Sequence, residues 1–209
     1  MSKYSQKENL ISNQAWKNIA MNQIISNQVR WTTSDLELLQ TDEWKRYEII
    51  DGELFVTRAP HWKHQGTAGN INLELQIWSR SSGLGKTRQT PGIIFTDADN
   101  VIPDVVWISR ERLAQLLDDE GHLRGAPELV VEVLSPGATN ERRDREAKLK
   151  LYSVTGVQEY WIANWQLQQL EVYRRETAQL KLLATLLADD EITSLILPGF
   201  RVRVQSFFV

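Results

Sequence analysis

Residues 127–136 read PELVVEVLSP, and residues 141–163 continue as ERRDREAKLKLYSVTGVQEYWIA. The run Glu128–Leu134 is apolar except at its acids, and continuous apolarity is typical of a strand buried on both faces of a sheet. The spacing of apolar residues over Asn140–Val154 predicts a helix, and Gly156–Ala163 predicts a second strand. Strand, helix and strand in this order predict a right-handed crossover between parallel neighbours. The fold class expected from it is α/β (α+β), with a mixed sheet flanked by helices.

The helix of this crossover brings a lysine toward the first strand. Its inward face is predicted to hold Ala147, Leu151 and Val154. The helix starts close to the end of the strand that carries Glu132, so Lys148, about two turns into the helix, can be brought back over that strand. The local alternative is that Lys148 pairs with Asp144, four residues earlier, on an exposed helix face.

Segments before the crossover predict a hairpin and two helices. Asp51-Gly52 lies between two β-prone runs within Tyr47–Val56, which is a strong signal for a β-hairpin. Helical spacing over His64–Trp78 predicts a helix that ends at Gly83. The pattern Ser34-Asp35-Leu36-Glu37 is a capping box, and it predicts a short helix that begins there.

Further strands are predicted on both sides of the crossover. Lys86–Thr96 and Val101–Ile108 predict two strands joined by a turn, and Asp104 lies on the second. The predicted C-terminal strands are Leu170–Tyr173, Leu180–Leu187 and Thr193–Leu197.

Length and composition limit the class of protein. A chain of 209 residues with 42% hydrophobic residues is long enough for one domain with a substantial core. Residues 1–30, rich in Asn, Gln and Ser, predict a polar N-terminal arm, and residues 31–209 the domain. The chain has no cysteine, which excludes disulfides and thiolate chemistry. It also lacks a membrane-length apolar run and the apolar core of a secretory signal at its start, so we expect a cytoplasmic location.

The formal net charge is −3, so binding to nucleic acid requires a local basic patch. The candidate is Arg142–Lys150, where Arg and Lys outnumber Asp and Glu. A solvated helix face with internal salt bridges is the alternative interpretation.

Asp104 in IPDVVWI and Glu132 in PELVVEVLSP stand within otherwise apolar runs. Burial of an ionised carboxylate costs several kcal/mol, so each acid needs a cation, a metal or hydrogen-bond donors. An Asp and a Glu that converge from neighbouring strands suit Mg²⁺, and this indicates phosphodiester chemistry. The alternative is that Asp104 ends its strand in a solvated turn and that Glu132 pairs with a downstream arginine.

Several motifs together resemble a known family. These are YEIIDGEL, HWKHQG, IPDVVWI, PELVVEVLSP and RRDREAKLKLYSVTGVQEYWIAN. They are similar to the Uma-type family of restriction endonucleases, which belongs to the PD-(D/E)XK nuclease superfamily, over about Trp31–Val209. The resemblance implies a restriction-endonuclease-like core, DNA as the partner, and hydrolysis of phosphodiester bonds with Mg²⁺ or Mn²⁺ as the cofactor.

The resemblance also implies roles for particular residues. Asp104 and Glu132 match the motif acids and would be catalytic residues that hold the metal, whose bound water is activated for attack. Glu48 matches an early glutamate that often joins such sites, and Glu53 is a weaker rival. For Glu48 the alternative is an outward-facing residue of the hairpin.

One position departs from the superfamily pattern. A lysine commonly follows the motif glutamate by two residues, where this chain has Leu134. Lys148 is the candidate replacement, and it would stabilise negative charge in the transition state. The departure keeps a second function open, which is a catalytically weak or inactive nucleic-acid-binding or scaffold protein.

Other side chains are candidates for contacts around the site. His64 and Arg143 would touch phosphate or support the metal ligands. His61 and His64 have no third histidine or cysteine nearby, so zinc is not expected. Trp62 is the tryptophan to consider for base stacking, because most others fall within predicted strands or helices.

The expected partner is DNA, with no membrane association. A homodimer is the other expectation, because a duplex has two strands to cut and the C-terminal strands up to Val209 are apolar. The chain has no Walker A sequence or dinucleotide glycine pattern, so neither ATP nor NAD is expected.

Overall fold

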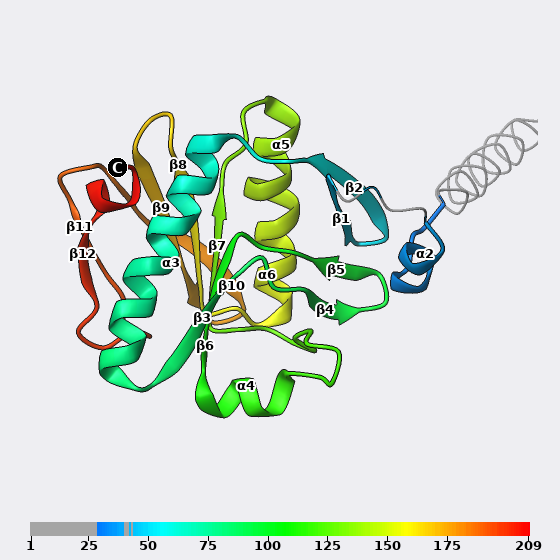
Figure 1. The fold of residues 1–209 in the computed structure, drawn as a ribbon, viewed down its shortest axis with the longest axis horizontal. Coiled ribbons are helices and arrows are strands. Elements are labelled where there is room, and N and C mark those ends of the chain that lie inside the picture. Colours follow the sequence, from blue (N-terminus) through cyan, green and yellow to red (C-terminus); the bar gives the residue numbers. More distant parts are fainter. Residues whose placement is uncertain (1–28, 40–41, 43) are drawn as a thin grey trace, which may run out of the picture. The chain divides into compact units, whose positions relative to one another are not determined.

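The computed structural model describes residues 29–39, 42 and 44–209 (Figure 1). Its contacts divide the chain into two units, Met1–Arg30 and Trp31–Val209. The polar arm predicted for residues 1–30 lies outside the described residues except for its last two. The second unit is a mixed α+β domain with several sheets flanked by helices, which confirms the predicted fold class.

The described residues form three sheets. The six-stranded sheet has the order β10 (Gln179–Leu186), β9 (Gln169–Glu176), β8 (Glu159–Asn164), β7 (Leu129–Val133), β6 (Val105–Ser109) and β3 (Gly85–Gln89). The four-stranded sheet has the order β2 (Glu53–Arg58), β1 (Lys45–Ile50), β5 (Asp99–Val101) and β4 (Ile93–Thr96). The third sheet pairs β11 (Glu191–Thr193) with β12 (Arg201–Arg203).

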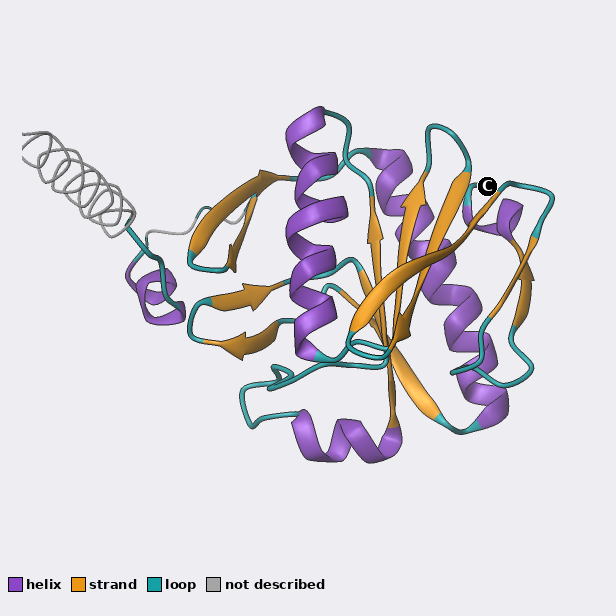
Figure 2. Cartoon of the chain, turned by 180° about the vertical axis from the view of Figure 1, so that it is seen from behind, coloured by secondary structure: helices purple, strands orange, loops and turns teal. Residues whose placement is uncertain are grey.

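The predicted crossover lies at the centre of the six-stranded sheet. Strands β7 and β8 pair in parallel, whereas the other strand pairs of this sheet are antiparallel. The connection is one continuous helical stretch, made of α5 (Ala138–Arg142), a π-helical segment (Arg143–Lys148) and α6 (Leu149–Thr155) (Figure 2). Gly156 ends it in the left-handed conformation, with φ 101°.

The predicted hairpin is also confirmed. β1 and β2 pair antiparallel, and the turn residues Asp51 and Gly52 have φ of 50° and 74°. Positive φ at both central positions is the requirement of a type I′ turn, which Asp-Gly meets readily. β1 also pairs with β5 through Ile49 and Asn100. The hairpin is thereby held beside the chain that leads into β6.

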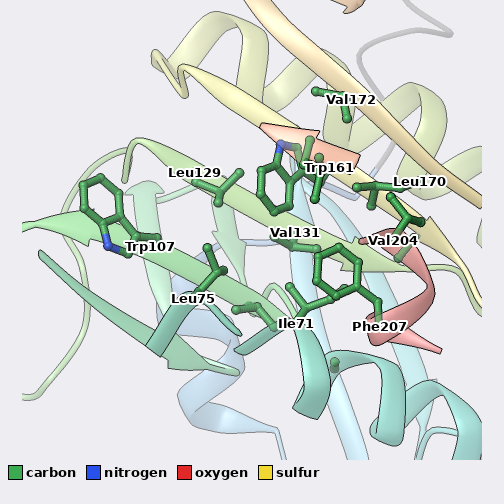
Figure 3. Close-up of a cluster of buried hydrophobic side chains, with 14 of the residues drawn as sticks. Ile71, Leu75, Trp107, Leu129, Val131, Trp161, Leu170, Val172, Val204 and Phe207 are labelled. Atoms are coloured by element: carbon green, nitrogen blue, oxygen red, sulfur yellow. The ribbon is translucent and has the colours of Figure 1, made fainter. Parts of the chain in front are cut away.

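Helix α3 (Trp62–Ser82) contains the predicted helix His64–Trp78 and ends at the left-handed Gly83, with φ 70°. Its buried apolar residues pack on the six-stranded sheet against Trp107, Leu129, Val131 and Trp161 (Figure 3). The opposite face of the sheet packs on the π-helical segment and α6. β7 is therefore covered on both faces, which explains its continuous apolarity. Among the described residues, no helix is both long and apolar enough to cross a membrane.

Two predicted strands are each divided in the structure. Lys86–Thr96 becomes β3 and β4, and Val101–Ile108 becomes β5 and β6. A proline lies in each interruption, Pro91 in the first and Pro103 in the second. Proline has no backbone N–H for a strand ladder, so each run changes sheets at that point.

The first described helix, α2 (Thr33–Leu38), begins earlier than predicted. Its N-cap is Thr32, which forms a reciprocal capping box with Asp35. The pattern that starts at Ser34 was therefore the wrong pair, because a second Thr/Asp pair with the same spacing lies two residues earlier.

Two further expectations are wrong. Val154 is 73% exposed, and Tyr152 is buried in its place. The π-helical segment adds a residue to the helix and so shifts the phase of everything that follows it. Of the predicted strand Thr193–Leu197 only Thr193 is in a strand, and Leu195 is 77% exposed. Pro198-Gly199 follows this run, and the chain turns there instead of extending.

Candidate active site

Asp104 and Glu132 lie on one side of the six-stranded sheet. Glu132 is on β7, and Asp104 directly precedes β6. Val105 pairs with Val131 in the antiparallel register, so the next position sets Asp104 opposite Glu132. Opposed residues of antiparallel strands point to the same face, with Cβ atoms about 5 Å apart. Both acids are buried, which rules out the solvated turn considered for Asp104.

Lys148 joins two of the buried carboxylates. Its Nζ lies 2.8 Å from Oε1 of Glu132 and 2.8 Å from Oε1 of Glu48. The Tyr152 hydroxyl, one helical turn later, donates to the same Glu132 oxygen over 2.9 Å. Lys148 is fully buried. The exposed pairing with Asp144 considered for this lysine is therefore wrong, and so is the outward-facing position considered for Glu48.

Glu132 is the least favourably ionised member of this cluster. Burial raises its pKa, the ammonium of Lys148 lowers it, and three neighbouring carboxylates raise it again. These neighbours are Asp104, Asp144 and Glu48. The pKa of Glu132 is raised to about 8. Burial and the neighbouring acids therefore favour the protonated form of Glu132 while no other cation is bound.

Glu48 has the opposite shift. Burial would raise its pKa, but the charges of Lys148 and Arg143 outweigh that effect and lower it. The backbone N–H of Ile102 also donates to Oε1 of Glu48 over 2.9 Å. Lys148 has its own pKa raised, since the carboxyl groups of Glu132, Glu48 and Asp144 together outweigh the effect of burial on the ammonium. The ammonium of Lys148 therefore lies between two carboxyl groups, of which Glu48 ionises more readily than Glu132.

Asp104 is held by a separate set of donors. Arg46 donates to Oδ1 over 3.0 Å, and the N–H of Val133 donates to Oδ2 over 2.9 Å. Nε2 of His64 lies 3.3 Å from Oδ2. Burial alone would raise the pKa of Asp104, but His64 and Arg46 lower it well below the usual range. Asp104 is therefore a stable carboxylate across the physiological pH range.

The π-helical segment supplies the remaining charged groups. Nε of Arg143 donates to Oδ1 of Asp144 over 2.9 Å, and Asp144 is fully buried. Arg143 also stabilises the charge of Glu48. In a π-helix one turn holds an extra residue, and such turns occur often at functional sites. Here it places Asp144 and Lys148 in the buried layer together.

Within the described residues, Glu48 and Glu132 each have one oxygen without a hydrogen bond. Their donors all reach the Oε1 atoms and leave the Oε2 atoms. Carboxylate oxygens are the ligands that hard divalent cations prefer, so this donor set fits Mg²⁺ or Mn²⁺. Both oxygens of Asp104 are engaged, so a cation at Asp104 would have to displace Arg46 or His64.

Elsewhere in the described residues, one surface loop brings three potential ligands together. Atoms of Asp118, Glu120 and His122 lie within 4.8 Å of one another. Nε of Arg124 lies 2.6 Å from Asp118, and its side chain is 48% exposed. These three potential ligands were not singled out from the sequence, and Arg124 already neutralises part of their charge.

Not every predicted site residue joins the cluster. Glu53 is exposed at the first position of β2. The basic patch predicted over Arg142–Lys150 is divided: Arg143 and Lys148 point inward, whereas Arg142 and Lys150 are exposed. Arg142 forms a surface pair four residues along its helix.

Sequence reasoning missed Arg46 and Tyr152. Arg46 precedes Glu48 by two residues on β1, and side chains two apart on a strand share a face. Tyr152 follows Lys148 by four residues, the spacing of helical neighbours. Both spacings were visible in the sequence. They point to Arg46 and Tyr152 only once Glu48 and Lys148 are known to be buried.

The start of α3 forms the rim of the site. His61 caps the helix by accepting from the N–H of Lys63, and its ring stacks on Trp165 at a centroid distance of 4.9 Å. Lys63 lies over the same indole ring. Trp62 is 87% exposed beside them, and His64 points inward to Asp104.

Comparisons with known proteins agree with this fold. The family model Uma2, described as "Putative restriction endonuclease", matches residues 33–205. A crystal structure from Anabaena variabilis, titled as that of "a putative nuclease belonging to DUF820", superposes with a TM-score of 0.67 at 16% identity. The match covers 85% of this chain and 97% of that chain. None of the curated proteins matches significantly.

The family match spans most of the domain, from residue 33 at the start of α2 to residue 205, and it includes every residue of the buried cluster. The family resemblance seen in the sequence motifs is thereby confirmed. This chain belongs to the Uma2 family of restriction-endonuclease-like proteins.

Proposed function

We propose that the protein is a metal-dependent DNA endonuclease that hydrolyses phosphodiester bonds. The observation that carries the proposal is the group of three buried carboxylates, Glu48, Asp104 and Glu132, with one buried lysine between two of them. A domain does not gain stability simply by burying such a charged group, because desolvation offsets the attraction. A catalytic role gives a reason to keep it.

Asp104 and Glu132 would hold the cation. When bound, Mg²⁺ or Mn²⁺ supplies a water of lowered pKa and neutralises charge on a phosphate oxygen. Asp104 brings a permanent carboxylate to this position, since its pKa is lowered by its neighbours. Glu132 would lose its proton to solvent when it becomes a ligand, and Oε2, which the donors to Oε1 do not reach, is the atom that it would offer.

Lys148 has one N–H hydrogen-bond donor that neither glutamate uses. An ammonium group has three N–H donors, and the contacts with Glu48 and Glu132 use two. The third would donate to an oxygen of the phosphate as negative charge develops there. Lys148 would thus replace the lysine of the usual motif, whose position here is filled by the buried Leu134.

His64 would orient Asp104 and contact the substrate. Its Nε2 side faces Asp104, and its Nδ1 is a buried atom without a hydrogen-bond partner in the described residues. A buried unsatisfied ring nitrogen is costly. A phosphate oxygen or an ordered water at the site would satisfy it.

The second candidate function is nucleic-acid binding without catalysis. It is favoured by the internal pairing of the cluster, in which Lys148 bridges two carboxylates and Arg46 with His64 engages both oxygens of Asp104. A cluster already neutralised in this way would also serve as a purely structural network.

A plasmid-cleavage assay separates the two candidates. Wild-type protein with Mn²⁺ should convert supercoiled plasmid to nicked or linear DNA, and Asp104→Asn and Glu132→Gln should abolish this. Glu53→Gln is the matched control, since it removes an exposed carboxylate of the same domain. Retained cleavage in either cluster variant would refute the assigned roles. Absence of cleavage by the wild type, with DNA binding retained, would favour the second candidate.

A further inference from the structure

A basic hollow lies between the second half of α3 and the edge strand β3. Its volume is about 360 Å³, and Arg80, Lys86, Arg88 and Arg110 line it. These four cations are called the basic track below. Ser79 and Thr87 also line the hollow, and no acidic side chain does.

The basic track differs from several exposed cations of the domain that have an acidic partner. Arg124, Lys181 and Arg201 each face a carboxylate at 2.6, 2.9 and 2.7 Å. None of the four track residues forms an ion pair with the part of the chain that the structure describes. Like charges gathered without a counter-charge repel one another, and a bound anion would remove that cost.

Three separate elements contribute to the track. Arg80 comes from α3, Lys86 and Arg88 from β3, and Arg110 from the start of α4 (Arg110–Leu116). β3 pairs only with β6 among the described strands, so its outer edge is free. Cations on an edge strand prevent edge-to-edge association, which would account for Lys86 and Arg88. It does not account for Arg80 and Arg110, which converge on the same hollow from helices.

The track leads away from the candidate active site. In the β3–β6 register Arg88 lies opposite Val106 and Lys86 opposite Ile108. These positions are two and four residues beyond Asp104, or about 7 and 13 Å along the sheet. Arg110 follows the end of β6 and extends the line by a further step. Arg88 and Lys86 therefore lie at increasing distance from the buried acids along the sheet.

The hollow also contains a hydroxyl donor. Ser79 Oγ accepts a hydrogen bond from Trp107 Nε1 over 2.9 Å, and within the described residues this is its only side-chain hydrogen bond. Its own proton is free to be donated toward the hollow. Four cations with one hydroxyl donor suit the oxygens of phosphate groups.

We propose that the basic track binds the phosphate backbone of the nucleic acid strand that runs from the candidate active site across β3. The inference deepens the proposed function and rests on it for the identity of the ligand. The contacts would be made to phosphates and not to bases, so they would hold the substrate in place without selecting its sequence.

Binding without cleavage tests the track. Fluorescence anisotropy of a labelled DNA duplex, in EDTA and over a series of salt concentrations, gives the affinity and its salt dependence. The double variant Arg80→Gln with Arg110→Gln should weaken binding about tenfold at low salt and reduce the slope of log K against log salt by about 2. Both side chains are exposed, so the melting temperature should stay that of the wild type.

The matched control is Arg201→Gln with Arg203→Gln, which removes the same charge from two exposed positions on strand β12. It should change the affinity less than twofold if the track acts locally. Equal weakening in both double variants, or in neither, would overturn the proposal.

A third arm identifies the source of the phosphate. If millimolar inorganic phosphate raises the melting temperature of the wild type but not of the track variant, while DNA affinity is the same in both, the hollow takes free phosphate and the nucleic-acid inference fails. The cleavage assay is separate. If the track substitutions weaken DNA binding but the wild type does not cleave DNA, the track proposal is supported and the nuclease activity is refuted. If the wild type cleaves DNA but the track substitutions leave binding unchanged, the nuclease activity is supported and the track proposal is refuted.

Discussion

The buried cluster of Glu48, Glu132 and Lys148 and the exposed loop of Asp118, Glu120 and His122 both gather acids, but under different conditions. The loop has its three potential ligands within 4.8 Å of one another, and water and Arg124 share its charge. The cluster is buried, and the ammonium of Lys148 contacts two of its carboxyl groups. Close acids alone therefore do not identify a site. Burial of the acids is what identifies a site, because it costs free energy and a fold retains buried acids only for a reason.

The largest expected effect is the loss of the buried cation. Lys148→Met should destabilise the domain by about 3–5 kcal/mol, because it leaves Glu48 buried without the cation that contacts it. Arg124→Met in the loop should leave the unfolding free energy unchanged within error. Urea denaturation of both variants measures the difference. Adding Glu48→Gln to Lys148→Met should recover part of the loss, and no recovery would show that the two groups are not coupled.

Metal binding gives the next largest effect. Mn²⁺ at about 100 times its Kd should stabilise the wild type by about 2.7 kcal/mol, which calorimetry detects as a higher melting temperature. Glu132→Gln should remove this stabilisation, and Asp118→Asn should keep it. If Asp118→Asn alone removed it, the surface loop would be the cation site and the comparison would be reversed.

The pH dependence of metal binding sharpens the same contrast. The pKa of Glu132 is raised to about 8, so below pH 8 the cation must displace a proton from it. Affinity for Mn²⁺ should therefore rise at least about tenfold between pH 6.5 and 8.5. The pKa of Asp118 is lowered, so a site in the loop would show no such rise from its carboxylate. Titration calorimetry at the two pH values decides, and a flat profile counts against Glu132 as a ligand.

The smallest expected effect concerns competition at Asp104. Arg46→Gln removes the guanidinium that donates to Oδ1 and should tighten Mn²⁺ binding about fivefold, equivalent to about 1 kcal/mol. Arg112→Gln is the matched control, since Arg112 pairs with Glu128 away from the cluster. Weaker metal binding in Arg46→Gln would instead mean that Arg46 helps to hold Asp104 in its binding position.

The central part of the fold was predictable from the sequence because its signals are local. The crossover, the Asp51-Gly52 hairpin and the end of α3 at Gly83 each depend on residues next to one another in the chain. The acids Asp104 and Glu132 stood out for a physical reason, since a carboxylate in an apolar run must find a partner. The partner itself depends on tertiary structure, which is why Arg46 was not found.

The sequence-based predictions that proved wrong have a common cause. Pro91 and Pro103 mark where two runs leave one sheet for another, and the sequence alone does not show that the second sheet exists. Val154 was placed inward on a regular helical phase that the π-helical segment changes. The pattern of charges in Arg142–Lys150 was visible, but which of them turn inward depends on that same segment.

The widened turn over Arg143–Lys148 has an evolutionary consequence. Such a turn is equivalent to a single inserted amino acid, and deletion of that amino acid would rotate the rest of the helix by about 100°. Lys148 and Tyr152 would then lose Glu132 while the helix itself remained intact. A deletion or insertion of one codon is thus enough to separate a descendant that keeps the contacts of Lys148 and Tyr152 with Glu132 from a descendant that has the same fold without them.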